Sequence, residues 1–138
     1  RDKEINYFIA CDSCKRNGDI CVQDDDMAEI LNKMITSDVI VMATPVYFYT
    51  MDAQMKTLID RTYSRYMEIR NKDFYFIVTA AVTRKQALER TIEGFRGFTS
   101  VLSGSKEKGI VYGTGAWNIG DIKSSSAMKE AYEMGKAV

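Results

Sequence analysis

The 138-residue sequence contains no histidine and only one proline. Without histidine, the chain cannot build a histidine-based catalytic triad, a histidine general base or the usual zinc site of an enzyme. This absence disfavours the common hydrolases. It favours instead a protein whose chemistry is supplied by a bound cofactor.

The sequence is also poor in cysteine and has no excess of charge. The three cysteines, Cys11, Cys14 and Cys21, are odd in number and clustered, which makes a poor disulfide framework, so a cytoplasmic location is expected. Nineteen basic and nineteen acidic side chains cancel. No apolar run approaches the length of a membrane span. We therefore expect neither nucleic acid nor a membrane as a partner.

Helical and strand-like patterns alternate along the chain, which is typical of a parallel α/β sheet. The length predicts one domain, residues 1–138. Short apolar, β-branched or aromatic runs predict strands at 39–43, 74–79 and 109–113. Apolar residues at helical spacing predict helices that begin at Asp24–Asp26 and others over 52–67, 84–102 and 124–137.

The most informative segment is 38–61. Its apolar strand is expected to end at Thr44-Pro45, because proline has no amide hydrogen and fixes its own φ. Three aromatics, Tyr47 to Tyr49, follow in a loop, and Asp52 begins the next helix. Ligands of doubly wound sheets lie at the carboxyl ends of strands, so the aromatics are well placed for a flat ligand. The alternative is a hydrophobic plug or a dimer contact.

The run Thr44-Pro45-Val46-Tyr47-Phe48-Tyr49, followed by Met51, Gln54-Met55-Lys56 and Ile59-Asp60-Arg61, resembles the flavodoxin-fold NAD(P)H-dependent FMN reductase family, near its iron–sulfur flavoprotein branch. The similarity extends through nearly the whole chain. It implies an α/β fold, a flavodoxin-like three-layer αβα sandwich with a parallel sheet of order 2-1-3-4-5. This chain would supply the last three strands.

The family's phosphate-binding loop, a Gly-Ser-Pro-like turn after the first strand, is missing from the numbered chain. The predicted strands would also leave the run 38–44 as a fully apolar edge, and such edges are normally paired or covered. We therefore expect that a first strand–loop–helix–strand unit is missing from these residues. The alternative is a complete small domain with a short sheet. On the first interpretation the chain supplies the flavin-ring half of an FMN site.

The resemblance assigns that half-site to two loops. The first, Pro45, Val46, Tyr47 and Phe48, would lie along the isoalloxazine and offer backbone amides to its polar edge, while Thr44 would reach the ribityl chain. In the second, the small residues Thr79, Ala80 and Ala81 would let the backbone approach the ring, the alternative being an ordinary turn.

The function that the resemblance implies is an FMN-dependent oxidoreductase that passes electrons from NAD(P)H to a small-molecule or protein acceptor. No catalytic acid or base is expected, because the flavin supplies the chemistry. A homodimer or higher homo-oligomer is expected. The alternatives are an electron carrier with an iron–sulfur centre and a binding module of this fold that lacks flavin.

The cysteines weaken the iron–sulfur alternative. Cys11 and Cys14 have Cys-x2-Cys spacing, but Asn17 stands where the branch's four-cysteine motif needs its third ligand. The simpler interpretation is a relic motif whose cysteines pack as small buried hydrophobes, so neither a cluster nor another metal site is expected. A labile cluster on Cys11, Cys14 and Cys21 and a redox-active Cys11–Cys14 pair are alternatives.

Other residues have two interpretations each. Arg61, Arg65 and Arg70 favour either a pyridine-nucleotide phosphate or a solvated helix face. Trp117 follows the last strand and would contact either a flavin of a neighbouring subunit or the core.

A surface for self-association is the final expectation from the sequence. Tyr63 and Tyr66, together with Met51 and Met55, are expected to form an apolar patch on or beside the central helix. Flavin reductases of the resembling family commonly dimerise with the flavin near the interface.

Overall fold

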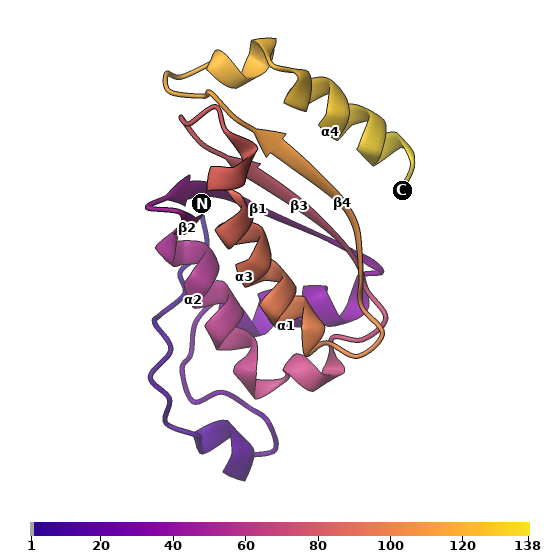
Figure 1. Cartoon of the computed structure of the whole chain (residues 1–138). Helices are drawn as coiled ribbons and strands as arrows, with labels where there is room; N and C mark the ends of the chain where they lie inside the picture. The colour runs from indigo at the N-terminus through magenta and orange to yellow at the C-terminus, as the bar shows by residue number, and fades with distance from the viewer. Residues whose placement is uncertain (1) are drawn as a thin grey trace.

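A four-stranded sheet of order β2-β1-β3-β4 forms the centre of the computed structural model, which describes residues 2–138 (Figure 1). Strands β1 (Val39–Tyr47), β3 (Asp73–Thr79) and β4 (Lys106–Gly113) are parallel neighbours. The two-residue strand β2 (Thr50–Met51) pairs antiparallel with the end of β1. The three parallel strands therefore have the order expected for the last three strands of a flavodoxin-like sheet.

The parallel ladder between β1 and β3 ends at Pro45 as predicted, but the strand itself does not end there. The parallel pairing continues to Pro45, which lies opposite Thr79, and the strand runs on to Tyr47. Proline is tolerated there because β1 is at the edge of the parallel sheet, where one side of the strand needs no amide donors.

Helices cover both faces of the sheet. Phe74, Phe76 and Val78 of β3 are fully buried and form the main core with α1 (Met27–Thr36), α2 (Ala53–Arg61) and α3 (Glu89–Ser100). The alternate residues of the strands face α4 (Ser126–Lys136), which packs on β4. Figure 1 shows α4 on the side of the sheet away from α3.

The helix that follows β1 starts as predicted but ends early. The Asp52 carboxylate accepts a hydrogen bond from the Met55 amide (2.9 Å) and caps α2. The helix ends at Arg61, and two 3-10 turns, Thr62–Ser64 and Tyr66–Glu68, replace its predicted last part. These turns lead to Ile69, which follows the second turn and is wholly buried.

The remaining boundaries shift by a few residues. The predicted helix 84–102 divides into a 3-10 turn, Lys85–Ala87, and α3, while the last helix begins at Ser126 after another 3-10 turn, Asp121–Ser124. A further 3-10 turn, Ser13–Arg16, lies in the cysteine region. No helix within residues 2–138 is long and apolar enough to cross a membrane.

The expected apolar edge is present. The outer edge of β1 pairs with β2 only at Val46 and Tyr47, and Val41 is 56% exposed. An apolar groove of about 220 Å³ runs between β1 and α4, along Val39, Tyr75 and Ile77 among others. This part of the sheet face is uncovered in the described chain.

Candidate functional site

A cavity of about 520 Å³ lies where the parallel strands end. It is built from the end of β1 and its turn, from the loop after β3 and from the loop after β4. The lining residues are Pro45, Val46, Tyr47, Phe48, Thr79, Ala80, Ala81, Ala116 and Trp117. Seven of the eight residues predicted to contact a cofactor therefore share this cavity, which we call the strand-end pocket.

Thr44, the eighth predicted residue, is not among the lining residues. Its side chain is buried, and its hydroxyl accepts a hydrogen bond from the Asp52 amide (3.1 Å). The same hydroxyl lies 2.8 Å from the carbonyl oxygen of Pro45, to which it donates. Thr44 thus ties the end of β1 to the start of α2, and its contact with a ribityl chain stays a prediction.

The aromatic segment forms a two-residue β-hairpin turn instead of an open loop. Phe48 (φ 49°) and Tyr49 (φ 68°) both have positive φ and connect β1 to β2. Such turns normally use Asn-Gly, because bulky residues are strained at positive φ. Sequence reasoning missed the hairpin because no glycine marks it. Backbone strain of this kind clusters at functional sites.

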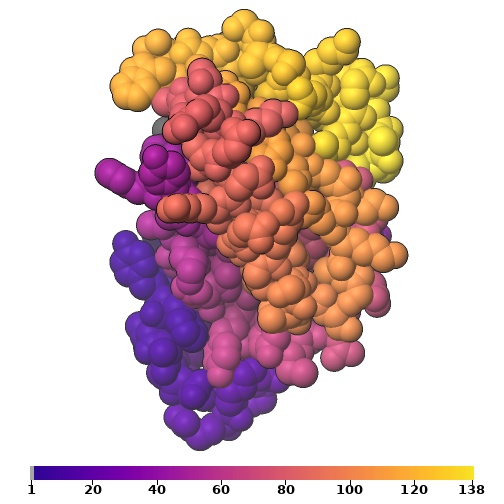
Figure 2. Space-filling model, viewed as in Figure 1, coloured from indigo at the N-terminus to yellow at the C-terminus, as the bar shows by residue number. Residues whose placement is uncertain are grey.

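Helix α3 holds the strained hairpin in place. Met51 is buried, and its Cε lies only 2.9 Å from where a β-carbon on Gly94 would stand. The Thr91 hydroxyl donates to the Tyr49 carbonyl oxygen (3.4 Å). Phe48 itself is completely exposed, and Figure 2 shows the hairpin projecting from the surface beside the segment that enters α3. The buried Met51 also rules out its predicted place in a self-association patch.

Backbone hydrogen bonds lock the loop after β4 onto the loop after β3. The Ala80 amide donates a hydrogen bond to the Gly113 carbonyl (2.9 Å), and the Ala116 amide donates one to the Ala80 carbonyl (3.0 Å). The Asp121 carboxylate accepts from the amides of Trp117 (3.0 Å) and Asn118 (2.7 Å). These contacts fix the two loops as one rigid wall of the pocket.

Trp117 is on that wall and is 81% exposed, so the predicted core contact is wrong. Its place beside Ala80 and Ala81 could have been found from the sequence, since the loop after β4 must end at the same edge of a parallel sheet as the other two. The lining contains no carboxylate, lysine or arginine. The pocket can therefore surround a flat uncharged ring, and its polar side-chain groups are the hydroxyls of Tyr47 and Thr79 and the indole N–H of Trp117.

The cysteine loop, residues 11–23, lies at the other end of the molecule, where Figure 1 shows the indigo segment below the sheet. Cys11 is exposed, Cys14 is buried and Cys21 is half-buried, so only Cys14 packs as predicted. All three face a small cavity of about 20 Å³. Within residues 2–138, no three cysteine or carboxylate side chains are placed to hold a metal ion. The three cysteines supply one thiolate fewer than the four that a four-iron cluster takes.

Arg61 anchors the cysteine loop to α2. Its side chain is 1% exposed and makes two hydrogen bonds to the Asp25 carboxylate (2.7 and 3.0 Å). It also donates to the Asn6 carbonyl (2.6 Å) and lies 3.7 Å from the Cys21 sulfur. Both interpretations of Arg61 from the sequence, a phosphate ligand and a solvated face, are therefore wrong.

The buried ion pair changes the titration of Asp25. Burial alone would raise the pKa of this carboxyl, but the hydrogen bonds from Arg61 and from the amides of Asn6 and Met27 outweigh it and lower the pKa to about 2. Asp25 is therefore charged at any ordinary pH. A buried charged pair thus joins the carboxyl-terminal flank of the cysteine loop to α2.

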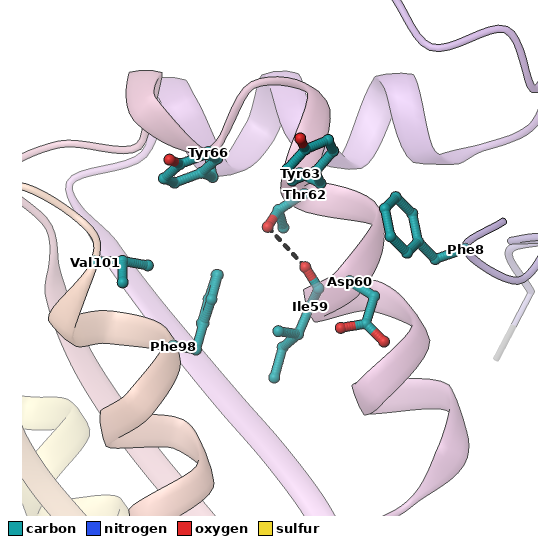
Figure 3. A pocket seen from close by; sticks show the side chains of 8 residues that line it. All are labelled: Phe8, Ile59, Asp60, Thr62, Tyr63, Tyr66, Phe98 and Val101. Carbon is teal, nitrogen blue, oxygen red and sulfur yellow. Dashed lines mark hydrogen bonds between the residues drawn. The ribbon is translucent and has the colours of Figure 1, made fainter. Parts of the chain in front are cut away.

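A second groove, of about 280 Å³, lies between the end of α2 and the end of α3 (Figure 3). Tyr63 and Tyr66 line it with Phe98, and Phe8 reaches it from the amino-terminal segment. The rings of Phe8 and Tyr63 meet edge to face, with centroids 5.5 Å apart. Met55 lies elsewhere, partly buried against the core. The two tyrosines therefore lie on an apolar surface, but without the two methionines expected beside them.

Comparison with known sequences gives consistent matches. The model of the family described as NADPH-dependent FMN reductase matches residues 1–106. An iron–sulfur flavoprotein of Methanocaldococcus jannaschii is 34% identical over 146 residues, which covers 99% of this chain and 75% of the relative. An iron–sulfur flavoprotein of Methanosarcina thermophila is 46% identical over 73 residues, or 53% of this chain and 36% of the relative.

Comparison of structures gives the same fold. The Trp repressor binding protein from Bacillus subtilis superposes with a TM-score of 0.71 at 23% identity, over 79% of this chain and 75% of that one. An FMN-dependent NADH-azoreductase from Bacillus anthracis, solved in complex with FMN, gives a TM-score of 0.69 at 12% identity, over 99% of this chain and 77% of that one. At these identities the likeness shows the fold alone.

Proposed function

We infer that this chain, which belongs to the NADPH-dependent FMN reductase family, binds the isoalloxazine of FMN in the strand-end pocket and passes electrons from NAD(P)H to an acceptor. Membership of the family rests on the match over residues 1–106 and supports a flavin oxidoreductase. The observation that supports the site is the convergence of three loops on one cavity at the carboxyl ends of the strands.

The pocket's residues fit the flat part of a flavin. Small side chains at Ala80 and Ala81 leave the backbone open to a ring, and Trp117 and Phe48 offer aromatic surface at the rim. FMN, when bound, would supply the acceptance of a hydride from the nicotinamide and the delivery of electrons to the acceptor. The chain's own share is to orient the ring, to exclude water and to place backbone amides at its polar edge.

Self-association is the second part of the proposal. Two apolar surfaces support it, the uncovered edge of β1 around Val41 and the groove lined by Tyr63 and Tyr66. Apolar surface of this kind is typical of interfaces between subunits. Light scattering of the purified chain at several concentrations gives the mass directly.

The three free cysteines support a cytoplasmic location.

A pocket-filling variant tests the flavin site. Ala81→Leu adds three carbons to the pocket wall and should weaken FMN binding by ~10-fold or more, as expected for overpacking of a fitted site. FMN uptake is followed by the absorbance of the bound flavin, and turnover by NAD(P)H oxidation with an artificial acceptor. Ala28→Leu, on the exposed face of α1, is the matched control.

The two variants separate a specific effect from a general one. The proposal expects the control to bind FMN as the unaltered chain does. Equal FMN affinity in both variants, or no uptake of FMN by the unaltered chain, would contradict the proposed site.

A further inference from the structure

Three cations lie close together in the segment between the loop after β3 and the first turn of α3. Arg84, Lys85 and Arg90 are all exposed. None of the three forms an ion pair among the described residues, although the whole chain has as many acidic as basic side chains. An excess of positive charge therefore stands beside the pocket.

Aromatic faces hold two of these cations in place. The Arg90 guanidinium carbon lies 5.4 Å from the centre of the Tyr49 ring, and the Lys85 ammonium lies 5.2 Å from that of Tyr112. An aromatic face attracts a cation without neutralising it, so the charge stays available to an anion. Tyr49 is next to Phe48 on the hairpin, and Tyr112 precedes Gly113 at the end of β4. Both contacts therefore lie beside the walls of the strand-end pocket.

Of the two carboxylates nearest in sequence, only Glu93 is paired with a cation; the partner of Glu89 is a hydroxyl, so Glu89 offsets part of the positive charge of the three cations. Glu89 accepts a hydrogen bond from the Tyr112 hydroxyl (2.9 Å), and Glu93 pairs with Arg96 (2.6 Å). The pocket itself has no charged lining residue. A nucleotide whose nicotinamide lies against the flavin ring in this pocket would therefore bring its phosphate groups near these cations.

We propose that Arg84, Lys85 and Arg90 bind the phosphate groups of the nicotinamide nucleotide donor, an assignment that rests on the proposed function. Guanidinium groups bind phosphate oxygens in a bidentate manner, and lysine adds a point charge. Two phosphate groups of the donor have this chemistry, the pyrophosphate shared by NADH and NADPH and the 2′-phosphate of NADPH alone. The three residues would thus orient the donor and contribute to its selection.

The test compares charge-removing variants in the full chain. Arg84→Gln, Lys85→Gln and Arg90→Gln are made singly and together. Arg70→Gln is the control, because Arg70 is also exposed, forms no ion pair with a described carboxylate and precedes β3 at the opposite end of that strand. Dissociation constants of NADPH and NADH are measured by calorimetric titration, and FMN uptake is measured separately by absorbance. Each lost phosphate contact should weaken donor binding by roughly tenfold, and the effect should fall at high salt.

The outcomes are distinguishable. Weaker binding of both nucleotides assigns the cations to the pyrophosphate, and weaker binding of NADPH alone assigns them to the 2′-phosphate. Either result supports the proposal. Unchanged affinity for both nucleotides, or a loss equal to that of Arg70→Gln, overturns it. If the variants lose FMN instead of the nucleotides, the cations bind the flavin phosphate and the donor assignment is wrong. Failure of the unaltered chain to take up FMN would contradict the proposed function, while the nucleotide titrations would still decide this inference.

Discussion

The strand-end pocket and the cysteine loop lie at opposite ends of the molecule and are held by different kinds of contact. The pocket's loops are joined by several backbone hydrogen bonds, among them those of Ala80 and Ala116, and α3 supports the hairpin. The cysteine loop contains no strand and only one 3-10 turn, and the guanidinium of Arg61 joins its two flanks to α2. Backbone hydrogen bonds therefore hold the pocket, whereas side-chain contacts hold the cysteine loop. These are the buried ion pair at its flank and the hydrogen bonds from Lys15 to the Ser64 carbonyl (3.1 Å) and from the Tyr63 hydroxyl to Asp12 (2.9 Å).

The largest expected effect is that of removing this pair's cation. Arg61→Met should lower the free energy of unfolding by about 3–5 kcal/mol, because the Asp25 carboxylate would stay buried without its partner. The measurement is equilibrium unfolding in urea. Arg61→Met combined with Asp25→Leu should recover part of the loss, since neither charge is then left alone, although the amides of Asn6 and Met27 lose their acceptor.

An exposed pair provides the control for this comparison. Arg65 pairs with Glu68 at the surface (2.7 Å), and Arg65→Met should cost no more than about 1 kcal/mol. If Arg61→Met were as mild as Arg65→Met, the cysteine loop would not depend on the buried pair.

The pH dependence of stability gives an intermediate effect. The pKa of Asp25 is lowered from 3.8 to about 2 in the folded chain, so its contribution to stability is present above about pH 4 and is lost as the pH falls toward 2. The shift corresponds to ~2.4 kcal/mol at 1.36 kcal/mol per pKa unit. Asp25→Asn lacks this titration. The difference in stability between the two proteins should therefore shrink between pH 6 and pH 2; a constant difference would contradict the lowered pKa.

The smallest expected effect concerns the strained hairpin. Tyr49→Gly should be no less stable than the unaltered chain, because relief of about 1–2 kcal/mol of positive-φ strain offsets the 0.5–1 kcal/mol entropy cost of glycine and the loss of the Arg90 contact. Tyr47→Gly, in the strand just before the turn, should lose about 1 kcal/mol. Equal losses in thermal or urea unfolding would show that the turn is unstrained.

The parts of the structure that could be predicted are those that depend on local sequence patterns. Helix and strand periodicity is local, so the predicted order of the main helices and parallel strands is confirmed, and the apolar residues Leu88, Ile92 and Phe95 of the predicted helix 84–102 are buried. The family resemblance assigned Thr79, Ala80 and Ala81 to the same half-site as Pro45, and these residues line one pocket with it. The order of elements follows from spacing alone, whereas the half-site residues needed the family resemblance.

The failures involve contacts between residues far apart in the sequence or choices of backbone conformation. Arg61 is buried because it meets Asp25, 36 residues away, and no local pattern records that meeting. The β1–β2 hairpin was not predicted, because Phe48 and Tyr49 occupy turn positions where glycine or asparagine is normally found. In both cases tertiary contacts determine a conformation or a burial that the local sequence does not favour.

Hydrogen exchange of the chain with and without FMN tests most directly the claim that the flavin site is confined to the strand-end pocket. Bound FMN should slow exchange of backbone amides in segments 44–50, 79–83 and 113–118 and leave residues 11–23 unchanged, because the cysteine loop lies at the other end of the molecule. Protection confined to the cysteine loop, or absent from the three pocket segments, would contradict the account.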